Sequence, residues 1–414
     1  MLKIFKTYRG LPKSIYILFI AQIINRFGDF VVPFLTLYLT QKIGLSAGIS
    51  GIIVTANILI GIPASLIGGK TADSLGRRKT YLWSQSIAAI SLLPCAVFKN
   101  PVIIVTCLMI NAFFTGFIRP ALSAIVADVL PPKQRQLGFS LQYLGTNIGV
   151  SLGPIVAGIL FKNMLPMLFI GDALTSLLAV ILIALYVEET NPSHNKVIRQ
   201  FEKEEKGGVI RAFAKRPYLC IFLVVYIAYC FVYTQHRFSL PITMGDIYKL
   251  DGSTRFGYLM SINAFTVIFL TVAITSLTHK FHALTKIIIA GILYAIGFGM
   301  IGIIHNFALF VLSTVIWTIG EILVTTSFGV YISNNSPSNY RASFNAVGGL
   351  SWSIGGALGT SLAGKFIDSF GLNYIWSLTF IIAVIATIVM YVVKILSVNE
   401  ENRLKEEKCK EVKA

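Results

Sequence analysis

Apolar runs of about 20 residues recur from one end of this 414-residue chain to the other. Each run is long enough to cross about 30 Å of hydrocarbon as a helix. Only 13% of the residues are charged, about half the share found in a soluble domain. Because lipid offers the backbone no hydrogen-bond partners, each run is expected to be helical. The sequence therefore predicts an all-α membrane protein.

The apolar pattern predicts twelve transmembrane helices, which fall into two sets of six. Their expected boundaries are 14–39, 46–67, 79–98, 102–129, 137–160, 165–187, 218–240, 256–277, 286–304, 307–333, 343–364 and 374–395. The predicted organisation is an N-terminal six-helix bundle (1–187), a cytoplasmic linker (188–217), a C-terminal six-helix bundle (218–396) and a basic cytoplasmic tail (397–414). The first run is too long for a signal peptide, so we expect it to be retained as a helix.

The net charge of +17 is distributed unevenly along the chain. With the N-terminus inside, about 26 of the 35 lysines and arginines fall on the cytoplasmic side and about six on the outer side. This positive-inside bias explains the charge without nucleic acid. We expect an integral, multi-pass protein of the plasma (inner) membrane with both termini in the cytoplasm.

The two sets of six helices are related to each other in sequence. A shift of 206 residues brings eight residues onto identical ones, six of them within one predicted span. Gly149 then falls on Gly355, and Gly153 falls on Gly359. A duplication of this kind predicts two pseudo-symmetric six-helix bundles, which is a plan typical of transporters.

A dense polar cluster, GGKTADSLGRRKT, lies at residues 68–80 between the second and third predicted spans. The loop is expected to be tight, and Gly69 and Gly76 permit close backbone approach. Asp73 can accept hydrogen bonds from backbone N–H groups at a helix start, where the helix dipole favours an anion.

The arginines of this cluster suggest a second role. Arg77 and Arg78 can form bidentate pairs with carboxylates, and Asp128 at the inner end of the fourth span is an available partner. Such a contact would tie helices together while the inner face is closed. The competing interpretation is a plain positive-inside anchor, which would not require the glycines and the aspartate.

The cluster resembles the loop signature of the major facilitator superfamily. The matching residues are Gly69, Ala72, Asp73, Gly76, Arg77, Arg78 and Lys79, whereas Thr71 and Ser74 depart from the usual residues. The resemblance covers the whole chain and implies that the loop gates the inner side, with Arg77 and Asp128 at the positions of the family's ion pair.

The fifth predicted span carries a second motif, GTNIGVSLGPIVAG, at residues 145–158. Gly145, Gly149 and Gly153 share one helix face and allow close helix packing, and Pro154 adds a kink. The motif resembles the superfamily's antiporter signature, which is found mostly in drug and metabolite exporters. A pure packing face remains an alternative, because the eleventh span has the same spacing without the proline.

Charged residues inside the spans are few and expensive, so they indicate function. They are Arg26, Asp29, Arg119, Asp172, Arg237 and Glu321. The family resemblance implies that spans one, four, seven and ten line a central cavity, and all of these residues except Asp172 lie on those spans. Asp172 is interpreted as structural, and Arg237 as either a rim residue or a functional one.

Two carboxylates are candidates for proton coupling. Arg26 and Asp29 are three residues apart and can pair, so Arg26 is expected to keep Asp29 ionised. Glu321 has no lysine or arginine in its own segment and is the leading proton carrier, with Asp29 second. A cation from another span, such as Arg119, would reverse that order, and a glutamate that merely hydrogen-bonds the bundle is the alternative.

Arg26 and Arg119 are also predicted to contact substrate in the cavity. The seventh span adds Tyr226, Tyr229 and Tyr233 on one helix face, which would suit flat lipophilic or cationic ligands. An interfacial or lipid-facing packing stripe is at least as good an interpretation of these tyrosines.

The sequence therefore predicts a secondary active transporter that exports lipophilic or drug-like compounds in exchange for protons by alternating access. Uptake or exchange of a sugar, peptide or organic anion is the alternative, and a non-transporting receptor or enzyme is the competing class. The sequence has no P-loop and no CxxC pair, and its histidines are scattered, so we expect no enzymatic activity, cofactor or metal site. The expected partners are a small-molecule substrate, protons and the bilayer, with the chain acting as a monomer.

Overall fold

The structure, a computed structural model, describes residues 10–131, 134–190, 213–214, 216–278, 280–335 and 341–413, and within these ranges every regular element is a helix. The main helices are α2 (Lys13–Phe27), α3 (Val31–Leu37), α4 (Ala47–Leu75), α5 (Arg77–Ile90), α6 (Leu93–Val97), α7 (Pro101–Val129), α8 (Arg135–Asn163), α9 (Leu165–Tyr186), α11 (Pro217–Thr234), α12 (Ser239–Tyr248), α13 (Gly252–Thr278), α14 (Ala283–Gly299), α15 (Phe307–Asn335), α16 (Arg341–Phe370) and α17 (Tyr374–Lys413). The all-α prediction is confirmed.

Ten stretches of the described chain are long and apolar enough to cross a membrane. The longest, Pro217–Thr278, contains α11, α12 and α13 and so holds two of the predicted spans. Glycines and serines lower the hydrophobicity of α16, which lies outside the ten but is a 30-residue helix. Each of the twelve predicted spans therefore corresponds to helix in the structure.

The helices form two compact units. The first contains residues 1–198 and 237–268, and the second contains residues 199–236 and 269–414. The predicted bundles instead divide the chain at a linker, 188–217, most of which lies outside the described residues. The segment 237–268, which includes α12 and most of α13, belongs to the first unit although it follows α11 in sequence.

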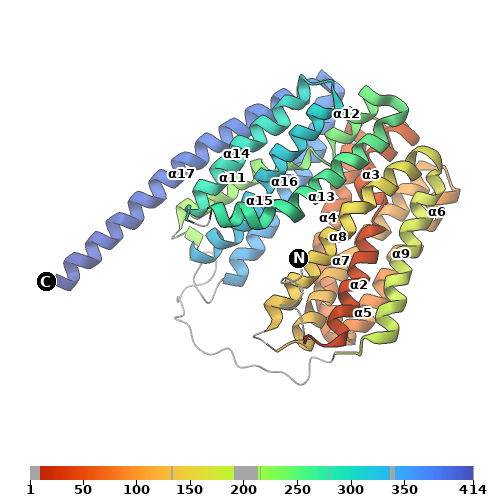
Figure 1. Ribbon diagram of the computed structural model, residues 1–414, viewed down its shortest axis with the longest axis horizontal. Helices are drawn as coiled ribbons and strands as arrows, with labels where there is room; N and C mark the ends of the chain where they lie inside the picture. Colours follow the sequence, from red (N-terminus) through yellow and green to blue (C-terminus); the bar gives the residue numbers. More distant parts are fainter. Residues whose placement is uncertain are drawn as a thin grey trace. The chain divides into compact units, whose positions relative to one another are not determined.

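In the first unit, α2 packs between α8 and α9, and α5 packs against α7 and α9 (Figure 1). Apolar side chains of α2, α5, α7, α8 and α9 meet in a buried core that includes Leu18, Tyr81, Ile125 and Ile183. This core fixes the first span against its neighbours.

The second unit repeats several of these pairings. The helix α11 packs against α16 and α17, as α2 packs against α8 and α9, and α14 packs against α15 and α17 (Figure 1). The equivalent pairs agree with the duplication inferred from the sequence.

The structure differs from the sequence prediction within the first span. The first span, 14–39, is not one helix: α2 ends at Phe27, Gly28–Phe30 is non-helical, and α3 begins at Val31. Gly28 leaves room for Thr175 of α9, and Pro33 removes a backbone donor just beyond the bend.

The 68–80 segment turns at a single residue, which agrees with the tight turn expected from the sequence. It is helical on both sides of Gly76, the one residue between α4 and α5. Gly76 has a φ of 104°, and this glycine conformation turns the chain without further residues.

Candidate functional site

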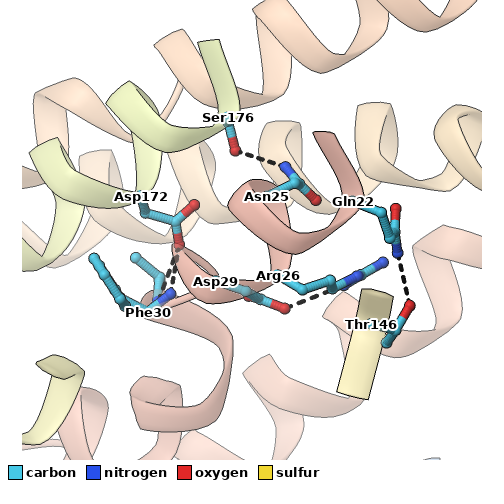
Figure 2. A network of polar contacts seen from close by, with 9 residues as sticks. Gln22, Asn25, Arg26, Asp29, Phe30, Thr146, Asp172 and Ser176 are labelled. Carbon is cyan, nitrogen blue, oxygen red and sulfur yellow. Dashed lines mark hydrogen bonds and ion pairs between the residues drawn. The ribbon is translucent and has the colours of Figure 1, made fainter. Parts of the chain in front are cut away.

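The break between α2 and α3 is surrounded by polar side chains (Figure 2). Arg26 Nη1 lies 3.2 Å from Asp29 Oδ2, so the expected ion pair is present across the end of α2. Asp172, from α9, points instead at the backbone of the broken segment (Figure 2). The side chains of Arg26 and Asp29 are 37% and 27% exposed, so both remain partly accessible.

Two further hydrogen bonds tie α2 to its neighbours just before the break (Figure 2). Gln22 Nε2 donates to Thr146 Oγ1 on α8 at 2.9 Å. Asn25 Nδ2 donates to Ser176 Oγ on α9 at 3.1 Å. These uncharged residues escaped the sequence analysis because single Asn and Gln side chains in a span carry no distinctive signal.

The glycines of the antiporter-like motif lie against this same stretch of α2. A Cβ at Gly149 would lie 2.7 Å from the Ile23 carbonyl oxygen, and a Cβ at Gly153 would lie 2.5 Å from that of Phe27. Gly145 faces Phe19 in the same way. The glycine face therefore lets α8 approach the backbone that carries Arg26.

The opposite side of α8 contacts α13. A Cβ on Gly257 would lie 2.3 Å from the Pro154 carbonyl oxygen, and Ser253 Oγ donates to the Gly158 oxygen at 3.2 Å. At the end of α8, Lys162 Nζ lies 2.6 Å from Asp251 Oδ1. Pro154 thus lies where α8 meets α13.

At the junction of α4 and α5, Arg77 forms an ion pair with Asp128 on α7. Its Nη1 also donates to the Ala124 carbonyl oxygen at 3.3 Å. The structure therefore brings together the two residues that the sequence predicts as partners. The side chain of Asp73 lies outside the described part of the chain, and Gly69 lies in α4, where a Cβ would approach Pro120 to only 3.9 Å.

The acceptor at the start of α5 is Glu189, which sequence reasoning missed. Its two carboxylate oxygens accept from the backbone N–H groups of Arg78 and Lys79, both at 2.9 Å. The Arg78 guanidinium donates to the Ala184 carbonyl oxygen on α9. Glu189 therefore has the capping role that was predicted for Asp73, and it lies more than 100 residues away in sequence.

Gly76 is required for this arrangement for a second reason. A Cβ there would lie 2.8 Å from the Glu189 carboxyl carbon. The glycine thus allows both the turn and the close approach of the carboxylate.

The remaining charged candidates, which are Glu321, Arg119 and Arg237, lie on separate segments of the chain. Glu321 is half-buried on α15, and its backbone oxygen accepts from Thr325 Oγ1 at 2.9 Å. The adjacent Gly320 faces α14, since a Cβ there would lie 2.9 Å from the ring of Tyr294. Arg119 on α7 and Arg237 after α11 are exposed. Their predicted roles stay predictions.

The three tyrosines of α11 are buried among aromatic side chains of the second unit. Tyr226 stacks on Phe328 with ring centroids 4.2 Å apart. Tyr229 donates to Thr387 Oγ1 at 3.2 Å, and Tyr233 contacts Trp317 and Trp352. The three rings therefore pack inside the unit rather than facing lipid, and their predicted contact with a ligand stays a prediction.

Comparison with known proteins agrees with this architecture. Residues 18–360 match the sequence model of the Major Facilitator Superfamily. A solved POT family transporter in complex with a thioalcohol-conjugated peptide superposes with a TM-score of 0.80 at 14% identity, covering 94% of this chain and 97% of that one. The chain belongs to the Major Facilitator Superfamily and is an integral, multi-pass membrane transporter of small molecules.

Several curated relatives have stated activities, and two of them are an ion antiporter and a resistance protein. The Na(+), Li(+), K(+)/H(+) antiporter of Planococcus maritimus is 24% identical over 353 residues, which cover 78% of this chain and 82% of the relative. The quinolone resistance protein NorA of Staphylococcus aureus (strain MRSA252) is 25% identical over 250 residues, which cover 57% of this chain and 64% of NorA. The chain is thus similar to an ion antiporter and to a resistance protein.

Proposed function

We propose that this transporter exports lipophilic or drug-like small molecules in exchange for protons by alternating access. The observation that carries the proposal of a charged transport site is the Arg26–Asp29 pair at a helix break inside the first span. Charged groups at membrane depth are expensive, and discontinuous helices in transporters commonly form ion or substrate sites. Similarity to an ion antiporter supports exchange, and similarity to NorA and the glycine–proline motif of α8 supports export.

In this proposal Glu321 carries the coupling proton and Asp29 is the second candidate. A carboxylate at mid-membrane must be neutralised, paired or hydrated, and proton binding to Glu321 would neutralise it before the cavity reorients. Arg26 balances the charge of Asp29 through the 3.2 Å contact. Asp29 is therefore less suited to bind and release a proton in each cycle.

The test is flux driven by an imposed pH gradient in proteoliposomes, with tetraphenylphosphonium as the lipophilic probe. Glu321→Gln should abolish gradient-driven flux and retain probe binding, whereas Asp29→Asn should be milder. Asp246→Asn, which changes an exposed carboxylate paired with Lys249, is the matched control. Full flux in Glu321→Gln would exclude Glu321 as the carrier, and loss confined to Asp29→Asn would move that role to the first span.

Uptake or exchange of a sugar, peptide or organic anion is the second candidate function. The partly exposed guanidinium of Arg26 and the exposed Arg119 favour an anionic substrate. Benzoate flux in the same proteoliposomes separates the two proposals. Benzoate carried in place of tetraphenylphosphonium would support this second function.

We also propose that the Arg77–Asp128–Glu189 cluster gates the cytoplasmic side of a monomer in the plasma (inner) membrane, with both termini inside. Arg77→Ala strands Asp128 and should slow transport of every substrate by about tenfold. The swap of Arg77→Asp with Asp128→Arg should recover part of that loss. Lys70→Ala, an exposed cation of the same segment, is the control. A changed substrate profile at normal turnover would contradict gating.

A further inference from the structure

The break in the first span leaves backbone donors that need acceptors. The first N–H groups of any helix have no partner within that helix, and lipid cannot supply one. At the start of α3, the N–H groups of Phe30 and Val31 both donate to Asp172 Oδ2, each at 3.1 Å (Figure 2). Phe30 N–H also reaches the Gly28 carbonyl oxygen at 2.7 Å. A single side chain on α9 therefore satisfies the N-terminal end of α3.

Other residues on this face of α9 also contact the break between α2 and α3. A Cβ at Gly28 would lie 1.7 Å from Thr175 Oγ1, and a Cβ at Gly171 would lie 3.0 Å from the ring of Phe30. Ser176, one turn beyond Asp172, accepts from Asn25 on the other side of the break. These contacts lie on both sides of the break and fix the bend at Asp29, just after the end of α2.

We propose that Asp172 is a positioning residue. Its carboxylate acts as a hydrogen-bond acceptor that holds the first span broken, so that Asp29 faces Arg26. Asp172 is 7% exposed, and its carboxylate accepts two hydrogen bonds from the backbone rather than pairing with a cation. An amide oxygen in the same place would accept the same two bonds, so the negative charge of Asp172 is not required. The inference rests on the proposed function only in assigning Asp29 and Arg26 to coupling.

The first measurement is hydrogen–deuterium exchange of peptides covering residues 28–34 in the full-length protein in nanodiscs. Asp172→Ala should accelerate exchange there by about tenfold or more, because Val31 N–H loses its acceptor and Phe30 N–H keeps only the Gly28 oxygen. Asp172→Asn should exchange as slowly as the wild type. Leu174→Ala is the matched control, since Leu174 lies two residues from Asp172 on α9 and its side chain is exposed.

The second measurement is pH-gradient-driven flux for the same variants. Asp172→Asn should retain flux within about twofold of wild type, and Asp172→Ala should lose it. If Asp172→Ala does not fold, Asp172→Asn alone decides. Loss of flux in Asp172→Asn with normal exchange would overturn the proposal and make Asp172 a charge-bearing group. Fast exchange in Asp172→Asn, or unchanged exchange in a folded Asp172→Ala, would also overturn it. If the wild type shows no proton-driven flux, the proposed function fails, whereas exchange still decides the role of Asp172.

Discussion

The first span of each half shows how differently the two copies of the duplicated unit have developed. In the first unit, Gly149 of α8 lies against the Ile23 oxygen and Arg26 Cβ. In the second, Gly355 of α16 lies against the Ile227 oxygen and Cys230 Cβ. These matching contacts make Ile23 equivalent to Ile227, and Arg26 equivalent to Cys230.

The same register matches three polar residues of the first span to the three tyrosines of α11. Gln22 corresponds to Tyr226, Asn25 to Tyr229 and Asp29 to Tyr233. Even a bond between equivalent helices is kept, because Asn25 donates to Ser176 on α9 and Tyr229 donates to Thr387 on α17. One half thus has a charged, partly exposed network where the other has a buried aromatic cluster.

The two equivalent spans also differ in how side chains bond to the backbone where the first helix ends. After α2, the donors of the next helix are satisfied by Asp172 from α9. After α11, Gln235 Nε2 donates to the carbonyl oxygens of Phe231 and Gly359, at 3.0 and 2.9 Å. The comparison teaches that the duplicated backbone is retained while the chemistry at its first helix diverges.

The largest expected effect comes from filling the close approach that both halves share. Gly149→Val and Gly355→Val would each drive a side chain into a neighbouring backbone, and each should destabilise its unit by about 3 kcal/mol. The free energy of unfolding in bicelles measures this, with Gly349→Ala as control because a Cβ there meets nothing within 4 Å. A large loss of stability for only one of the two variants would contradict the equivalence of the two glycine contacts.

A smaller effect is expected from removing the side-chain amide of Gln235, which donates to two backbone oxygens in the second half. Gln235→Leu leaves the Phe231 and Gly359 oxygens without this donor and should destabilise the protein by about 1–2 kcal/mol. The same unfolding measurement should show a smaller loss for Gln22→Leu, whose single bond to Thr146 is only partly buried. Equal losses would contradict the claim that the two breaks are held differently.

The smallest effect is expected from removing the interhelical hydrogen bond that is present in both halves. Tyr229→Phe and Ser176→Ala each remove one interhelical hydrogen bond, which in membranes is worth about 0.6 kcal/mol. Tyr229→Phe keeps the ring contact with Tyr294, so stability should fall only by the bond. A loss several times larger for Tyr229→Phe would show that the hydroxyl has a role beyond packing. Unfolding free energies of both single variants provide the measurement.

The sequence by itself determined the membrane class, the approximate positions of the helices, the duplication and the Arg77–Asp128 partnership. Length and apolar content act locally, so a run of residues reports its own tendency to cross lipid as a helix. Arg26 and Asp29 are also close in sequence, and their pairing needs only the spacing of three residues.

Only the tertiary structure decided which groups satisfy the backbone where helices end. Asp172 accepts from N–H groups that lie more than 140 residues earlier in the sequence, and Glu189 accepts from N–H groups more than 100 residues earlier. Gly28 and Pro33 signal that the first span can bend, but the acceptor at that bend depends on how α9 packs against α2. A freed N–H group bonds to whatever packing brings within about 3 Å, and spacing along the chain does not encode that neighbour.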